Sequence, residues 1–379
     1  MKILVLSPFP PRRDAAHGGA RSIAGLTWRL AEVHQVGLLA LRGPDEEPTE
    51  PELADRCEFV VETERKPVRT SPARAWEERQ RLAMTAAGAP GWAVGFSVRA
   101  FSRALDRVLD DWDPDVVQIE FAVMAQYASR IEGRPLVVVD HDPSDHSRAM
   151  RGFRATALRR ADAVVAFTQD DCAAIASLLP GVRVERIPLA VDVPESPLDP
   201  VGNGRDVVFV GNFMHPPNVD AAERLGTAIF PRVASKRPDA RLVLVGADPP
   251  KSLRELASTN VAVTGRVRDL RPLLDAAAVV AAPLTRGGGM RVKVLEALAA
   301  GKALVATPRA LAGVEVRSGE HAIVEEEDAP FADAIVMLLD DEKRRAAIAT
   351  AARAWAETHL DWQRTAAAYS ALYESLLES

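Results

Sequence analysis

Residues 283–301 read PLTRGGGMRVKVLEALAAG and follow a short apolar run at Ala278–Ala281. This run has the length and the β-branched content of a buried strand. The glycine run Gly287–Gly289 ends it, and a pattern with helical spacing starts near Met290. The stretch therefore predicts a strand, a glycine-rich turn and a helix, which together form the repeating unit of a parallel α/β sheet.

The same alternation extends from this stretch through most of the chain. Short apolar runs separated by longer helical patterns favour parallel sheets that carry helices on both faces. The predicted strands are Lys2–Leu6, Val36–Leu39, Phe59–Val61, Val116–Ile119, Leu136–Val139, Ala163–Phe167, Val182–Ile187, Val207–Val210, Arg241–Val245, Val261–Thr264, Ala278–Ala281 and Ala303–Ala306. The predicted helices are Ala20–Ala31, Phe101–Asp110, Ala155–Arg160, Asp170–Leu179, Asn218–Ser235, Ser252–Ala257, Leu270–Ala276, Met290–Ala300, Phe331–Leu338, Glu342–Thr358 and Asp361–Leu377.

A proline-rich segment at 188–205, PLAVDVPESPLDPVGNGR, divides this series into two halves. It has no helical period, and its prolines and glycines are typical of a linker. We therefore predict an α/β protein with two doubly wound Rossmann-like domains, at 1–188 and 206–360, joined by a linker at 189–205. Ligands of such folds bind outside the carboxyl ends of the strands, so an interdomain cleft is expected. The last helix, within 361–379, could belong to the second domain or cross back to the first.

The composition argues against several classes of protein. A formal net charge of -6 disfavours a nucleic-acid partner, because that binding needs an excess of Lys and Arg. Cys57 and Cys172 lack the spacing of a zinc site or a disulfide framework, so a cytoplasmic location is expected. No apolar run reaches the roughly 18 residues of a membrane span. The Arg-rich stretch Arg69–Arg81 could make a peripheral membrane contact, although such stretches are more often solvated helix faces.

The glycine-rich turn before the helix at 290–300 is a candidate phosphate site. Glycines let the backbone approach a ligand, and a helix amino terminus offers unpaired N–H groups and the positive end of its dipole. Arg291 and Lys293 add two cations where the dipole disfavours them, and a bound diphosphate would remove that conflict. The alternative is a flexible connector. The sequence contains neither a P-loop motif nor a GxGxxG run after its first strand.

Seven stretches of the chain, in order, resemble glycosyltransferase family 4, whose members have the two-domain GT-B fold. The resemblance spans almost the whole chain and is strongest from 205 to 315. It looks closest to members that act in bacterial polysaccharide or glycan assembly. The stretches read HGGARSIAGLTWRLAE, ADAVVAFTQDD, IPLAVDV, VVFVGNFMHPPNVDA, ARLVLVGADP, VTGRVRDLRPLLDAAAVVAAPL and GGGMRVKVLEALAAGKALVAT.

This resemblance implies that the segment 287–296 binds the sugar donor. Glu296 matches the second glutamate of the family's E-x7-E motif, which contacts the ribose of the nucleotide. The position of the first glutamate holds Gly288, so backbone N–H groups of Gly288 and Gly289 would have to replace its carboxylate. Gly287 and Met290 complete the implied donor segment.

The resemblance also implies where positive charge meets the diphosphate. The family's usual basic pair after the first strand of this domain is replaced by Gly211-Asn212, and Gly211 remains a donor-binding candidate. Arg291 and Lys293 are then expected to stabilise the charge that develops on the leaving nucleoside diphosphate. Arg266 matches the loop that frames the base, although a surface arginine is an equal alternative. We expect neither a metal nor another cofactor, because no acidic DxD metal site is visible in the donor-binding half of the sequence.

Two further candidates lie in the first domain. Gly18 and Gly19, preceded by His17, resemble the glycine loop near the donor phosphates and the acceptor, although a plain helix start is the alternative. Glu120 follows the strand Val116–Ile119 and could orient the acceptor, and a buried or capping carboxylate fits equally well.

A histidine that ends another strand of the first domain is the remaining catalytic candidate. His141 follows Leu136–Val139 and matches the family histidine that contacts the donor sugar. Its neighbours Asp140, Asp142 and His146 also suggest an acid–base or metal cluster, whereas turn and cap chemistry explains the same residues.

The activity implied by the resemblance is retaining transfer of a sugar from a UDP- or GDP-sugar. The acceptor is a glycan, a lipid-linked molecule or a small molecule bound by the N-terminal domain. Two alternatives stay open: a sugar-nucleotide epimerase of the same fold, and a non-catalytic nucleotide-sugar-binding or scaffolding subunit. The second is prompted by Gly288 and by the absent basic pair.

Overall fold

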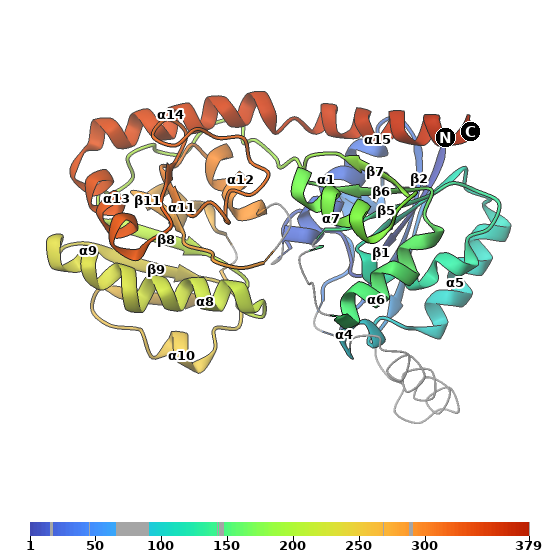
Figure 1. The fold of residues 1–379 in the computed structure, drawn as a ribbon, viewed down its shortest axis with the longest axis horizontal. Coiled ribbons are helices and arrows are strands. Elements are labelled where there is room, and N and C mark those ends of the chain that lie inside the picture. Colours follow the sequence, from blue (N-terminus) through green and yellow to red (C-terminus); the bar gives the residue numbers. More distant parts are fainter. Residues whose placement is uncertain are drawn as a thin grey trace. The chain divides into compact units, whose positions relative to one another are not determined.

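The computed structural model describes residues 1–15, 18–44, 46–65, 91–141, 143, 148–267, 269–287 and 291–378. The chain divides into two compact units, which are drawn in Figure 1. The first unit holds most of residues 1–188 together with the chain from Trp362 onward, and the second unit holds Leu189–Asp361. Each unit is built around a parallel sheet of its own.

The first unit contains, within the described residues, a seven-stranded sheet in the order β3-β2-β1-β4-β5-β6-β7. Its central strands β1, β4, β5 and β6 are buried on both faces, as their nearly continuous apolar runs require. The strands are β1 (Lys2–Ser7), β2 (Gln35–Arg42), β3 (Phe59–Glu64), β4 (Val116–Glu120), β5 (Leu136–Val139), β6 (Ala163–Ala166) and β7 (Arg183–Arg186). The helices are α1 (Gly18–Leu30), α2 (Pro51–Ala54), α4 (Gly91–Val94), α5 (Arg99–Asp111), α6 (Arg148–Ala157), α7 (Gln169–Leu178) and α15 (Trp362–Leu377), with 3-10 segments at Ala122–Arg130 and Leu158–Arg160.

The second unit contains, in its described part, a six-stranded sheet in the order β10-β9-β8-β11-β12-β13. All of its strand pairs are parallel. The strands are β8 (Asp206–Val210), β9 (Arg241–Val245), β10 (Val261–Gly265), β11 (Val279–Ala282), β12 (Leu304–Ala306) and β13 (Ile323–Val324). The helices are α8 (Pro216–Arg224), α9 (Phe230–Lys236), α10 (Lys251–Arg254), α11 (Arg271–Ala276), α12 (Val292–Ala299), α13 (Asp328–Asp340) and α14 (Glu342–His359).

Both strand orders reverse at the centre of the sheet. The chain winds from β1 outward to β3 and then returns to place β4 on the other side of β1. The strands β8 to β11 repeat this path in the second unit. Loops at the carboxyl ends of the two central strands therefore diverge, and ligands of doubly wound folds bind at that reversal. The predicted fold class is confirmed in both units.

The helix predicted at 218–235 is present, with one irregularity that the pattern did not show. A π turn at Leu225–Ile229 lies between α8 and α9, which starts at Phe230. Pro231 accounts for the π turn, because it has no N–H for the helical ladder and its ring crowds the carbonyl four residues earlier. The patterns also missed α2, β13 and the segment Ala122–Arg130, and α12 starts at Val292 rather than near Met290.

Three buried cations hold the proline-rich segment 189–205 against the rest of the second unit. Lys302, Arg345 and Arg353 are 0%, 2% and 9% exposed. A buried cation is costly unless it is hydrogen-bonded, so the carbonyls it meets are fixed in place. The bonds run from Lys302 to the carbonyl oxygens of Asp199 and Asp275, from Arg345 to that of Val201, and from Arg353 to that of Pro194.

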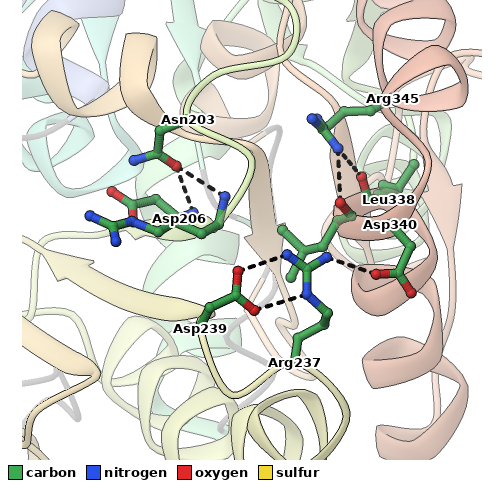
Figure 2. A network of polar contacts seen from close by, with 9 residues as sticks. Asn203, Asp206, Arg237, Asp239, Leu338, Asp340 and Arg345 are labelled. Carbon is green, nitrogen blue, oxygen red and sulfur yellow. Dashed lines mark hydrogen bonds and ion pairs between the residues drawn. The ribbon is translucent and has the colours of Figure 1, made fainter.

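A polar network closes the amino ends of β8 and β9 (Figure 2). Arg237 donates to both carboxylate oxygens of Asp239 at 2.9 Å and to Asp340 at 2.7 Å. Its guanidinium lowers the pKa of the Asp239 carboxyl. The Asn203 side chain accepts from the backbone N–H of Asp206, the first residue of β8, at 2.9 Å. These contacts hold the amino ends of β8 and β9. The diverging loops lie at the other edge of the sheet, at the carboxyl ends of the strands.

The C-terminal helix α15 is part of the first unit (Figure 1). Trp362, its first residue, packs so closely on α1 that a Cβ on Gly25 would lie 2.2 Å from the indole ring. Tyr369 and Tyr373 of the same helix are 2% and 0% exposed. The helix therefore contributes aromatic side chains to the core of a unit whose other elements lie far earlier in the sequence.

We predict opposite effects from two glycine substitutions in helices of the first unit. Gly25→Ala should lower the free energy of unfolding by about 1–3 kcal/mol, because the added methyl group collides with Trp362. Gly152→Ala in α6 should raise it by about 0.5–1 kcal/mol, because that position has open space and alanine favours helix. Urea unfolding measures both changes. An equal response of the two variants would contradict the close packing of α15 on α1.

We also predict that Lys302 makes stability depend on pH. Burial lowers the pKa of Lys302 from 10.5 to about 8. Between these values the unfolded chain binds a proton that the folded chain does not, so unfolding becomes harder as the pH rises. The cost of the buried charge is present in full below pH 8 and is lost by about pH 10.5. Urea unfolding from pH 7 to 10 should show this rise in the wild type and not in Lys302→Met; parallel curves would contradict it.

Candidate functional sites at the carboxyl ends of the sheets

In the first unit, two of the candidate residues meet at the carboxyl edge of the sheet. Glu120 is the last residue of β4, and His141 follows β5. The Nε2 atom of His141 lies 2.6 Å from Oε2 of Glu120, and the two side chains are 8% and 1% exposed. Because a carboxylate only accepts hydrogen bonds, Nε2 is the donor of this pair, and in a neutral imidazole Nδ1 is then an acceptor.

Aromatic rings fix the plane of this imidazole. Phe121 stacks on His141 with ring centroids 3.9 Å apart and an angle of 4°, and Phe167 meets it edge-on at 5.0 Å. Phe9 packs against the edge of Phe121 at 5.3 Å. Phe121 has a φ of 65°, an uncommon value for a residue with a side chain, and this packing holds it there.

Gly19, near the start of α1, lies beside the same rings. A Cβ built on Gly19 would lie 2.7 Å from Cζ of Phe121 and 3.3 Å from Cζ of Phe9. Glycine is thus required where the helix passes these aromatic rings. Gly18 is the first residue of the helix, and His17 lies outside the described residues.

Both oxygens of the Glu120 carboxylate are engaged inside the protein. Oε1 accepts from Nε2 of Gln118, two residues earlier on β4, and Oε2 faces His141. This burial favours the alternative of a buried carboxylate that supports the histidine. The acceptor-orienting role of Glu120 stays a prediction.

The residues around His141 do not form one acidic cluster in the described part of the chain. Asp140 is 2% exposed and pairs with Arg154 of α6 at 2.9 Å, so it fastens that helix to β5. Arg154 also donates to the carbonyl oxygen of Pro143 at 3.2 Å. Asp142 and His146 lie outside the described residues.

In the second unit, Lys293 lies at the reversal between β8 and β11. It is the second residue of α12, and its ammonium group is 4.9 Å from the centre of the Phe209 ring on β8. The same group donates to Oδ1 of Asn218, in the first turn of α8. Asn218 in turn donates to the carbonyl oxygen of Asn212 at 2.7 Å. One cation therefore joins the amino ends of two helices.

Glu296 lies one helical turn after Lys293, and both residues line the same small pocket. Val210, the last residue of β8, and the apolar Leu270 and Leu274 line its walls. The predicted donor residues Lys293 and Glu296 are thus brought together beside an apolar surface at the carboxyl edge of the sheet.

The other predicted residues of this unit surround that edge. Gly211 follows β8 and packs closely against Gly246. A Cβ added to Gly246 would lie 1.7 Å from the carbonyl oxygen of Gly211. Gly287 has a φ of 96°, and a Cβ there would lie 2.8 Å from Nη2 of Arg291. Arg291 caps the amino end of α12, and Arg266 is exposed after β10. Gly288, Gly289 and Met290 lie outside the described residues, as does Arg69–Arg81.

Four residues that complete these arrangements were not predicted. Phe209 and Asn218 orient Lys293, and Gln118 and Phe121 hold Glu120 and His141. Of these four, Phe121 and Gln118 were the easiest to identify from the sequence, because they flank Glu120 at the end of a strand. Asn218 follows two prolines at a helix start, a pattern that indicates a first turn but no ligand.

The described residues show neither a cluster of metal ligands nor a membrane-spanning helix. Among them, no group of three or more His, Cys, Asp and Glu side chains is arranged to hold a metal ion. None of the described helices combines the length and the apolarity needed to cross a membrane.

Two family descriptions match the chain. The one for Glycosyltransferase Family 4 matches residues 16–195, and the one for Glycosyl transferases group 1 matches residues 204–341. The two matches together cover most of the chain.

Similar curated proteins are mannosyltransferases of actinobacteria. A GDP-mannose-dependent monoacylated alpha-(1-6)-phosphatidylinositol monomannoside mannosyltransferase of Corynebacterium glutamicum is 38% identical over 35% of this chain and 39% of its own length. A phosphatidyl-myo-inositol mannosyltransferase of Mycobacterium tuberculosis is 28% identical over 46% of this chain and 48% of its own length. The match thus spans less than half of each of these relatives.

Solved structures with the same fold are similar over nearly the whole chain. Sucrose-phosphate synthase of Thermosynechococcus elongatus has a TM-score of 0.77 at 15% identity and covers 100% of both chains. Anabaena HepE in complex with UDP and glucose has a TM-score of 0.73 at 17% identity and covers 98% of this chain and 99% of its own.

We predict that Phe121→Leu moves the NMR signals of the His141 ring protons downfield. The stacked phenyl ring shields these protons at a centroid distance of 3.9 Å, and leucine has no ring current. Phe59→Leu is the matched control, because Phe59 packs on Trp112 elsewhere in the same unit. His141→Gln assigns the signals. An unchanged His141 spectrum in Phe121→Leu would show that the rings are not stacked.

Proposed function

The chain is a GT-B glycosyltransferase of the family 4, group 1 type, and we propose that it transfers a sugar with retention from a UDP- or GDP-sugar, without a metal. The family resemblance found in the sequence motifs is thereby confirmed.

The observation that carries the proposal is the position of Lys293 between the first turns of α8 and α12. Helix amino termini present N–H groups and a partial positive charge, and a lysine between two of them adds a full charge. This combination suits a diphosphate. As the bond to the sugar breaks, the leaving nucleoside diphosphate gains negative charge, and Lys293 and Arg291 stabilise it.

Glu296 is proposed to hold the nucleoside, because its carboxylate can accept hydrogen bonds from the ribose hydroxyls. Gly288 supplies no carboxylate for the donor sugar, so in our proposal the backbone N–H groups of Gly288 and Gly289 donate hydrogen bonds to the sugar instead. Arg266 is proposed to border the base.

His141 is proposed to contact the transferred sugar. Its Nε2–H is bound to Glu120, and the neutral ring keeps an acceptor at Nδ1 for a sugar hydroxyl. The first unit, which carries His141 and Gly19, is proposed to bind the acceptor. The names of the relatives make GDP-mannose the first donor and a phosphatidylinositol-linked lipid the first acceptor to test.

Calorimetric titration with UDP, GDP, ADP and dTDP, with and without EDTA, tests the donor site. One nucleotide should bind with micromolar affinity in both conditions. Lys293→Met should weaken it roughly 10- to 100-fold, because a charge-assisted hydrogen bond contributes about 1.5–3 kcal/mol. Glu296→Gln should also weaken it, by a smaller factor.

Lys251→Met and Glu255→Gln are the matched controls, since this exposed pair lies on α10 of the same unit. Their affinities should equal that of the wild type. Failure of all four nucleotides to bind would overturn the donor site, and loss of binding in EDTA would overturn metal independence. Binding without release of nucleotide from GDP-mannose or the UDP-sugars, with lipid acceptor present, would favour a non-catalytic subunit.

A further inference from the structure

A chain of buried hydrogen bonds links the C-terminal helix to His141. The hydroxyl of Tyr373 donates to Oε1 of Gln118, and Nε2 of Gln118 donates to Oε1 of Glu120. The other oxygen of Glu120 lies 2.6 Å from Nε2 of His141. Tyr373 and Gln118 are 255 residues apart in the sequence, yet both belong to the first unit.

The donors in this chain all point toward the carboxylate of Glu120. Tyrosine donates to the amide oxygen, which leaves the amide N–H groups for Glu120, and the imidazole donates from the other side. Tyr373, Gln118 and Glu120 are 0%, 1% and 1% exposed, so water does not compete for these bonds. Burial and the nearby Glu120 charge raise the pKa of Tyr373 well above its ordinary value, and the hydroxyl keeps its proton.

We propose that Tyr373 is a positioning residue, which keeps Gln118 and Glu120 oriented so that His141 stays in the Nε2–H tautomer with Nδ1 as the acceptor. The catalytic consequence rests on the proposed contact between His141 and the transferred sugar. Without the tyrosine hydroxyl, the Gln118 amide can turn, because its oxygen then has no donor from α15. Glu120 would lose one of its two donors, and the imidazole would no longer be held to one tautomer.

The placement of α15 makes this role specific to one hydroxyl. Trp362 packs on Gly25 and fixes the start of the helix. Ser370 lies 2.8 Å from Nε2 of His34 and fixes its middle. Tyr369 is buried beside Tyr373, with ring centroids 6.2 Å apart, and burial and the Glu120 charge raise the pKa of both tyrosines. The Tyr369 hydroxyl, however, makes none of the hydrogen bonds that link Tyr373 to His141. Tyr369→Phe is therefore a matched control on the same helix.

The experiment compares Tyr373→Phe with Tyr369→Phe in the full chain. Nitrogen-15 NMR of labelled histidine, at a pH where His141 is neutral, should show the Nε2–H tautomer in the wild type and in Tyr369→Phe. In Tyr373→Phe it should show a mixture of tautomers. Gln118→Leu should give the same mixture, because it breaks the chain one step nearer to Glu120. A single unchanged tautomer in both chain-breaking variants would overturn the proposal.

Kinetics with the nucleotide sugar that the titrations identify adds the catalytic test. Tyr373→Phe should lower kcat about 5- to 10-fold, the effect of one hydrogen bond, and leave the affinity for the free nucleotide unchanged. The catalytic part of the proposal would be overturned if Tyr373→Phe showed a mixture of tautomers but kept the wild-type kcat, while His141→Gln inactivated the enzyme. If His141→Gln itself keeps full activity, the role of His141 in the proposed function fails, and the NMR result still decides whether Tyr373 positions it.

Discussion

Parallel strands are joined only by crossovers, and right-handed crossovers place successive helices on one face of a sheet. When the chain returns to the other side of its first strand, the following helices cover the opposite face. The loops of the two central strands then leave the sheet in opposite directions. In both units the loops diverge at the carboxyl ends of the central strands, where the candidate side chains lie. Glu120 ends β4 in the first unit, and Lys293 lies beside the carboxyl end of β8 in the second.

Most strands and helices of this fold were predictable because their patterns are local. A buried parallel strand is a short apolar run, and β4, β5 and β9 show this within a few residues. The failures have local causes as well. Pro231 accounts for a π turn in a helical pattern whose apolar spacing continues across it, and β13 has only two residues, too few to show a period. The 3-10 segment Ala122–Arg130 begins after the positive φ of Phe121, which no pattern signals.

The candidate sites were predictable only in part, for a different reason. Lys293 and Glu296 stand one turn apart beside glycines, so the sequence itself places them together. Their partners come from distant segments, as Asn218 does for Lys293 across 75 residues. The buried cations at Lys302 and Arg353 gave no signal either, since lysine and arginine side chains are usually solvated. Only the fold shows which carbonyl groups they meet.

The placement of α15 bears on how such a protein can change by recombination. Its first unit is assembled from two stretches that lie far apart in the sequence, and Trp362 of the second stretch packs on Gly25 of α1 in the first. A single crossover near residue 188 would therefore combine α1 of one relative with α15 of another. Exchange of the whole first unit between relatives needs a double crossover, with one exchange on each side of the segment 189–361.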